Sequence, residues 1–159
     1  MRGNRVFTIA AQIIQGDTMS DKPTIELMRA LSNSESINSY MEHNNRFLVE
    51  GELSEHINRL CAKKGLVKAN VIRRAEINEI YAYQIFSGKR VPSRDKLLCL
   101  CLGMELDTIE TNQLLKYAGF APLYPKNKRD SIILFGFEKR QSIIAINETL
   151  YDNDESTLN

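Results

Sequence analysis

Apolar residues recur at three- and four-residue intervals through the middle of the chain, within residues 65–103. This spacing is typical of helices that bury one face and expose the other. One apolar stripe runs through residues 68–75 and a second through residues 79–87, with Ile77 between them. A third stripe covers residues 94–102. The pattern therefore predicts two short helices joined by a tight corner, followed by a loop and a third helix.

The second of these stretches has a buried side and an exposed side that the sequence distinguishes. Its apolar stripe runs from Tyr81 to Phe86, and Asn78 can cap the start of the helix through its side-chain oxygen. Gly88 then ends the helix, because glycine adopts the left-handed conformation at the lowest cost. The side chains left on the outer face are Glu79, Ile80, Tyr83, Gln84 and Ser87.

Helical periodicity continues on both sides of this segment. Asp107 with Glu110 three residues later predicts a capping box. The other helices are expected at about residues 25–31, 37–47, 55–64, 108–118, 131–139 and 143–151. The serines expected to cap helices are Ser36, Ser54, Ser93 and Ser142.

The last two expected helices, within residues 120–151, carry apolar residues on more than one side. They therefore either wrap the central helices or form the seam of a dimer, and both alternatives fit the pattern. The final residues, 152–159, are acidic and polar and are expected to be disordered.

The central segment resembles the Cro and phage-repressor-like (XRE-type) helix-turn-helix domains, over roughly residues 53–106. The whole run, including YAYQIFSGKRVPSRDKLL and the later GFAPLYPKNKRDSIILF, looks like a set of bacterial regulators that carry this domain with extra helices on both sides. It implies an all-α fold, in which a five-helix repressor-like helix-turn-helix domain carries additional N- and C-terminal helices. The matching positions are Gly65-Leu66, Ile72-Arg73-Arg74, Ile77, Ile85, Gly88-Lys89-Arg90, Pro92-Ser93, Leu97-Leu98 and Leu102-Gly103.

Pattern and resemblance together predict five segments along the chain. Residues 1–22 are a leader or a disordered arm, since Gln15 to Met19 back-translates to a ribosome-binding sequence before an ATG, which makes Met19 a candidate start. The other four segments are an N-terminal helical extension (23–52), the repressor-like domain (53–119), the C-terminal helical pair (120–151) and the tail (152–159).

The resemblance also implies which residues read DNA bases. In this family the first residues of the second helix of the motif, and one residue a turn later, contact base edges. At the matching positions stand Glu79, Ile80 and Gln84, with Tyr83 beside them. Gln84 suits a bidentate contact with adenine, Glu79 can accept from the cytosine amine, and Ile80 can pack on a thymine methyl group.

A second set of residues is expected on the phosphate backbone. The start of the first helix of the motif, at Lys68, usually lies on a phosphate, where the helix dipole favours an anion. Lys89, Arg90, Ser93 and Arg94 would hold the backbone on the other side of the reading helix.

The distribution of charge agrees with a DNA-facing centre. The whole chain has a net charge of only +1. Residues 53–102, however, hold ten Lys and Arg against four Asp and Glu, which is +6, so the remainder carries −5. A basic centre between acidic flanks is typical of a module that binds nucleic acid.

The sequence offers little for catalysis or for a cofactor. It has no phosphate-binding glycine loop, no grouping of nucleophile and base, and no metal-ligand spacing around its two histidines. Cys61, Cys99 and Cys101 lie in helical stretches and are expected to be reduced core residues of a cytoplasmic protein. The interpretation is therefore a non-enzyme without metal or cofactor.

Two functional hypotheses remain open. The first is a sequence-specific transcriptional regulator, a homodimer on double-stranded DNA that inserts residues 79–87 into the major groove and does not involve a membrane. The second is a module of the same fold that docks a partner protein, such as a kinase or a phage or defence component. The exposed Glu79 and Tyr83 favour the second, and the surrounding cations favour the first.

Overall fold

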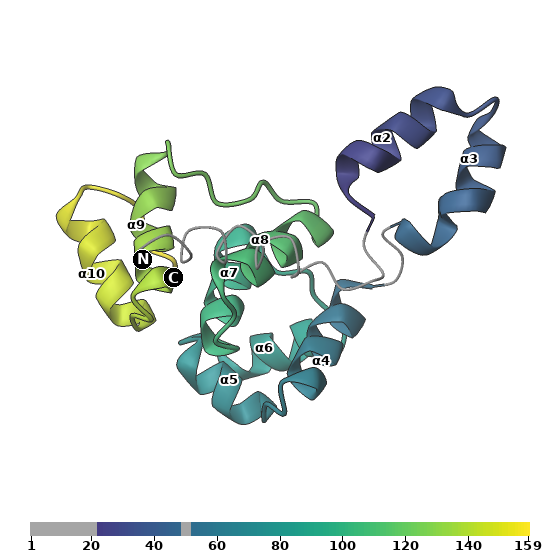
Figure 1. The fold of residues 1–159 in the computed structure, drawn as a ribbon. Coiled ribbons are helices and arrows are strands. Elements are labelled where there is room, and N and C mark those ends of the chain that lie inside the picture. The colour runs from purple at the N-terminus through teal and green to yellow at the C-terminus, as the bar shows by residue number, and fades with distance from the viewer. Residues whose placement is uncertain (1–21, 49–51) are drawn as a thin grey trace, which may run out of the picture. The chain divides into compact units, whose positions relative to one another are not determined.

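The computed structural model describes residues 22–48 and 52–159, and every regular element in these two ranges is a helix (Figure 1). The all-α class predicted from the sequence is confirmed for this part of the chain. The expected leader and the candidate start at Met19 lie outside the described residues. The elements are α2 (Thr24–Asn33), α3 (Ile37–Asn44), the 3-10 helix η1 (Asn45–Phe47), α4 (Leu53–Lys63), α5 (Lys68–Arg74), α6 (Glu79–Phe86), α7 (Arg94–Gly103), α8 (Thr108–Tyr117), α9 (Lys128–Glu138) and α10 (Ile143–Asp152).

The chain divides into two compact units, residues 1–50 and residues 51–159. In the first, the Ser36 hydroxyl accepts a hydrogen bond from the backbone N–H of Ser39 at 3.1 Å, so this predicted cap is confirmed. Its helices α2 and α3 bury only Tyr40 and Asn44.

Helix α7 is the centre of the second unit. Five consecutive residues, Leu97 to Cys101, have no exposed surface at all. A helix that is apolar on every side must be covered on every side, and α5 and α8 pack directly against it. The C-terminal segment covers it as well, since the Cys99 thiol lies 3.9 Å from the carbonyl oxygen of Leu158.

The approach of α5 to α7 depends on Gly103. A Cβ at this position would stand 2.5 Å from the carbonyl oxygen of Val71 and 3.0 Å from the Cβ of Ala75. Those separations are too short for any side chain, so only glycine lets the two backbones come this close. Arg74 adds a bond across the same contact, donating from Nε to the Gly103 carbonyl at 2.9 Å.

The C-terminal helices α9 and α10 lie side by side (Figure 1) and belong to the same core as α4–α8. Gly136 allows their close contact, because a Cβ there would fall within 2.5 Å of Ile146 Cδ1. Their inner residues include Ile133 and Ile143, which are buried with the residues of α7 in one cluster. The inner side of the pair therefore packs on the core, while Phe135, Ile144 and Tyr151 on its outer side are exposed.

Two crossed ion pairs attach α9 to the start of α7. Arg94 forms a forked pair with Asp130, at 3.0 and 2.9 Å. In the opposite sense, Arg129 forms a forked pair with Asp95, also at 3.0 and 2.9 Å. The same Arg-Asp dipeptide thus occurs on both helices, and each arginine binds the aspartate of the other. Such two-bond forks set orientation as well as distance.

The tail was expected to be disordered, and this expectation was wrong. Leu158 is only 2% exposed, and its backbone N–H donates to Asn147 Oδ1 at 2.8 Å. Arg129 also donates to the carbonyl oxygens of Ser156 and Thr157. The burial of Leu158 and the hydrogen bonds to Asn147 and Arg129 together hold the segment, and its acidic composition did not indicate either.

Most of the helix starts agree with the predicted caps. The side chains of Ser93 and Ser142 accept from backbone N–H groups of the first turn, and Asp107 with Glu110 forms the complete capping box. Ser54 is the exception, since α4 begins at Leu53, two residues before its expected start, and Ser54 lies inside its first turn. Helix α9 begins at Lys128, three residues before its expected start, because Asn127 caps it.

Replacing Gly103 by alanine should destabilise the second unit by about 3 kcal/mol, because the added Cβ overpacks a backbone contact. Urea unfolding followed by far-UV circular dichroism measures this loss. Gln113→Ala, an exposed change on α8, is the control and should stay within about 0.5 kcal/mol of the parent. Equal stability of the two variants would contradict the close approach of α5 and α7.

Burial should make the cysteine thiols inert in the folded chain. Desolvation raises the pKa of Cys99 from 9.0 to about 11 and that of Cys101 to about 12, and it also raises the pKa of Cys61. Since the thiolate is the reactive form, a chromogenic disulfide reagent at about pH 8 should label these thiols slowly until urea unfolds the protein. Above about pH 9 these thiols ionise in the unfolded chain before they ionise in the folded chain. The free energy of unfolding should therefore fall as the pH rises further. Rapid labelling of three thiols without denaturant would contradict the packed core.

Candidate nucleic-acid interface

The corner between α5 and α6 determines how α6 is presented. The two helices are joined by the four residues from Ala75 to Asn78. Ala75 is fully buried and Ile77 is 8% exposed, so the turn is anchored in the core. Asn78 caps α6 as predicted, with its Oδ1 accepting from the backbone N–H of Tyr81 at 3.1 Å. The direction in which α6 leaves the corner is thereby set by packing and by the cap.

The outer face of α6 carries the four residues predicted to read bases. Ile80 is 72% exposed and Tyr83 is 42% exposed, while Glu79 is also exposed and Gln84 is half-buried. The inner face holds Ala82, Ile85 and Phe86, which are buried. The side chains of Glu79, Ile80 and Tyr83 are therefore exposed to solvent, and Gln84 lies at the edge of this exposed face.

Three of the five predicted phosphate contacts are exposed cations around α6. The Nζ of Lys68, at the start of α5, lies 5.2 Å from the centre of the ring of Phe86, the last residue of α6. The guanidinium of Arg90 lies 5.7 Å from the centre of the Tyr81 ring, and its backbone N–H donates to the carbonyl of Gln84 at 3.1 Å. Within the described ranges, neither these two cations nor Lys89 forms an ion pair with a carboxylate.

The structure does not place Arg94 with these cations, although the sequence suggested it. All three guanidinium nitrogens are engaged inside the protein, with Asp130 and with the carbonyl oxygens of Ala121 at 3.0 Å and Pro122 at 3.4 Å. Its side chain is 23% exposed. Arg94 therefore serves to join α7 to α9. Ser93 likewise accepts from the Lys96 backbone N–H at 3.3 Å as the cap of α7.

The sequence pattern did not indicate the partner of Arg94, which is Asp130. Asp130 is only 8% exposed and also accepts from the Tyr124 backbone N–H at 3.0 Å. A signal was present, namely the repeated Arg-Asp dipeptide at 94–95 and 129–130. Repetition alone does not show that two dipeptides meet, because that requires the path of residues 120–127.

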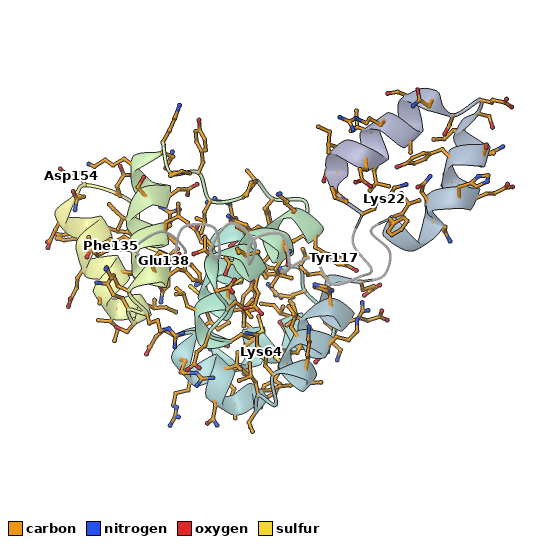
Figure 2. All side chains as sticks on the ribbon, viewed as in Figure 1. Lys22, Lys64, Tyr117, Phe135, Glu138 and Asp154 are labelled. Carbon is orange, nitrogen blue, oxygen red and sulfur yellow. The ribbon has the colours of Figure 1, made fainter. Side chains whose placement is uncertain are left out.

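Other contacts hold the surrounding helices in place. Lys64 at the end of α4 forms an ion pair with Glu110 of α8 at 2.9 Å, and the rings of His56 and Tyr117 stack with centres 4.2 Å apart (Lys64 and Tyr117 are labelled in Figure 2). In the described part of the chain, no three His, Cys, Asp or Glu residues are grouped to hold a metal ion. No helix there is both long and apolar enough to cross a membrane.

No protein-family profile matches the chain, and no curated protein or solved structure matches it significantly. The site is therefore described by its own geometry. That geometry is an exposed face of one short helix, held by a buried corner and bordered by three cations without carboxylate partners among the described residues.

Asp130→Ala should lower the free energy of unfolding by about 3 kcal/mol, because it leaves the largely buried guanidinium of Arg94 without its carboxylate. Thermal and urea unfolding would measure the loss. Glu148→Ala, at an exposed position of α10, should change stability by less than about 0.5 kcal/mol. If Asp130→Ala behaved like this control, the crossed ion pairs would not hold α9 to α7.

Proposed function

We propose that this protein is a sequence-specific DNA-binding transcriptional regulator in which α5 and α6 act as a repressor-like helix-turn-helix. The observation that carries the proposal is the outer face of α6. It exposes Ile80 and Tyr83 on a helix whose other face is buried, beside Lys68, Lys89 and Arg90. A helix presented in this way suits the major groove, which admits one helix and displays a distinct pattern at each base pair.

In this proposal the exposed side chains of α6 read base edges. Ile80 packs on a thymine methyl group, which accounts for an isoleucine left 72% exposed. Gln84 is the candidate for a bidentate contact with adenine, and Glu79 for a bond from a cytosine amine. Tyr83 lies beside them, where its ring and hydroxyl meet the groove wall.

The phosphate contacts come from a smaller set than the sequence suggested. Lys68, Lys89 and Arg90 are exposed and form no ion pair among the described residues, so they are available to the DNA backbone. Arg94 acts indirectly, by holding α7 against α9. The proposed regulator acts in the cytoplasm as a homodimer. A homodimer suits this function, because two copies can match the two halves of a palindromic operator.

Fluorescence anisotropy with labelled duplexes from the region upstream of the coding sequence tests this function. The parent should bind tightly, with an affinity that falls as salt rises. Changing both Lys89 and Arg90 to alanine should weaken binding to all duplexes and reduce the salt slope by about 2, roughly one for each phosphate contact. Lys116→Ala, an exposed lysine on α8, is the matched control and should leave the slope unchanged.

The same assay locates the reading face. Gln84→Ala should retain binding to generic duplex and lose preference for the operator by about 1–3 kcal/mol, the value of one bidentate base contact. Absence of binding even to generic duplex at low salt would refute the regulator.

The alternative function is docking of a partner protein through the same face. Its specific support is two large apolar side chains left exposed, Ile80 on α6 (72%) and Val91 in the loop that follows α6 (78%), together with the negative charge of Glu79. DNA repels a carboxylate, whereas a protein surface can pair with it. Failure to bind duplex, combined with loss of a co-purifying protein in Ile80→Asp, would favour this alternative.

A further inference from the structure

The C-terminal end of α6 is tied to α4, the helix that packs beside it (Figure 1). The Asn58 side chain of α4 donates from Nδ2 to the carbonyl oxygen of Phe86, the last residue of α6, at 2.8 Å. The last carbonyl groups of a helix have no partner within that helix. Asn58 therefore satisfies the end of α6 from a neighbouring helix.

The hydrogen bonds of Asn58 are one-sided. Its Nδ2 also donates to the carbonyl oxygen of Ser54, one turn earlier in α4, at 2.8 Å. Its Oδ1, by contrast, is buried and accepts no hydrogen bond among the residues that the structure describes. A buried acceptor left unpaired costs free energy, so stability alone does not explain an asparagine at this position. What the side chain provides is a donor directed at the end of α6.

Gly88 brings the chain that leaves α6 against the same part of α4. Its φ of +76° lies in the region that favours glycine. A Cβ at this position would also stand 3.0 Å from the Oγ of Ser54 and 3.1 Å from the Oε2 of Glu52. The chain is thus held against α4 twice within three residues, first by the hydrogen bond from Asn58 and then by this close contact.

Lys89 and Arg90 follow directly after these two contacts. The backbone N–H of Arg90 donates to the carbonyl of Gln84 at 3.1 Å, so this residue too is tied to the end of α6. Both side chains are exposed, and neither forms an ion pair within residues 22–48 and 52–159. Phosphate contacts fix the register of a protein on a duplex. The position of these two cations therefore depends on how the end of α6 is held.

We propose that Asn58 is a positioning residue for DNA binding. By holding the carbonyl end of α6 on α4, its amide group sets where Lys89 and Arg90 meet the phosphates of the duplex. Asn58 acts through these two cations and not through a contact of its own with DNA. The inference rests on the proposed function, and it adds a residue of α4, outside α5 and α6, to those on which DNA binding depends.

Fluorescence anisotropy with the full chain and labelled duplexes tests this role. Asn58→Ala should weaken binding to every duplex at least about fivefold and lower the salt slope by about 1–2, because two phosphate contacts are displaced. In a chain that already carries Lys89→Ala and Arg90→Ala, the same change should weaken binding less than about twofold, since the groups through which it acts are gone. An equal loss in both backgrounds would show a general structural effect and overturn the proposal.

Asn112→Ala is the matched control. This asparagine of α8 also bridges two segments, because its Oδ1 accepts from the backbone N–H of Leu123 at 2.8 Å. Its removal should lower the thermal midpoint, as removal of Asn58 does, yet leave the duplex affinity and the salt slope unchanged. If the two variants lost duplex affinity equally, the loss would follow stability, and Asn58 would have no positioning role.

Hydrogen exchange of the free protein gives a second measurement that needs no DNA. The backbone amides of Gly88 and Arg90 donate to carbonyl groups of α6. In Asn58→Ala both amides should exchange at least about tenfold faster, while those of α9 keep their rates. Unchanged exchange at the two amides would overturn the proposal.

The duplex assay also separates failure of this inference from failure of the proposed function. A parent that binds no duplex would refute the regulator and the positioning role with it. A parent that binds duplex no better than Asn58→Ala does would refute the positioning role alone.

Discussion

The second unit is built around the need to enclose α7. Residues 97–101 of this helix have no exposed surface, so no single neighbour could satisfy it. Helices α5 and α8 pack directly on it, and the C-terminal segment with Leu158 completes the cover. This requirement explains why the C-terminal pair belongs to the same core as the helices around α6. It also explains why the tail is ordered although its composition is polar.

The hydrophobic effect favours burial of α7 but does not set the orientation of the helices that cover it, so other contacts are needed. The crossed pairs Arg94–Asp130 and Arg129–Asp95 orient α9 against the start of α7. Gly103 lets α5 reach the other end of α7 at backbone distance. Because α5 leads into the corner that presents α6, the proposed DNA-reading face is ultimately positioned by these contacts. The same arrangement forms a cleft of about 690 Å³, where the ends of α5, α7 and α9 come together.

Local signals in the sequence predicted the helices well. Asn78, Ser93, Asp107 and Ser142 cap the helices that their positions indicated, since a cap depends on atoms only three residues apart. The buried and exposed faces of α6 also follow directly from its period. Where a local signal had a competitor, the prediction shifted by one to three residues. Ser54 did not cap α4, for example, because the helix begins at Leu53, two residues before its expected start.

By itself the sequence determined the all-helical class, most helix boundaries, the outer residues of α6 and the basic character of its surroundings. Only the tertiary structure decided which charges remain available. Arg90 and Arg94 look equivalent along the chain, yet Arg90 is exposed and Arg94 is held by Asp130, thirty-six residues away. The tail and the cleft were decided in the same way, since both depend on segments far apart in sequence. Periodicity reports the faces of one helix, whereas the pairing of those faces depends on how the connecting segments bring them together.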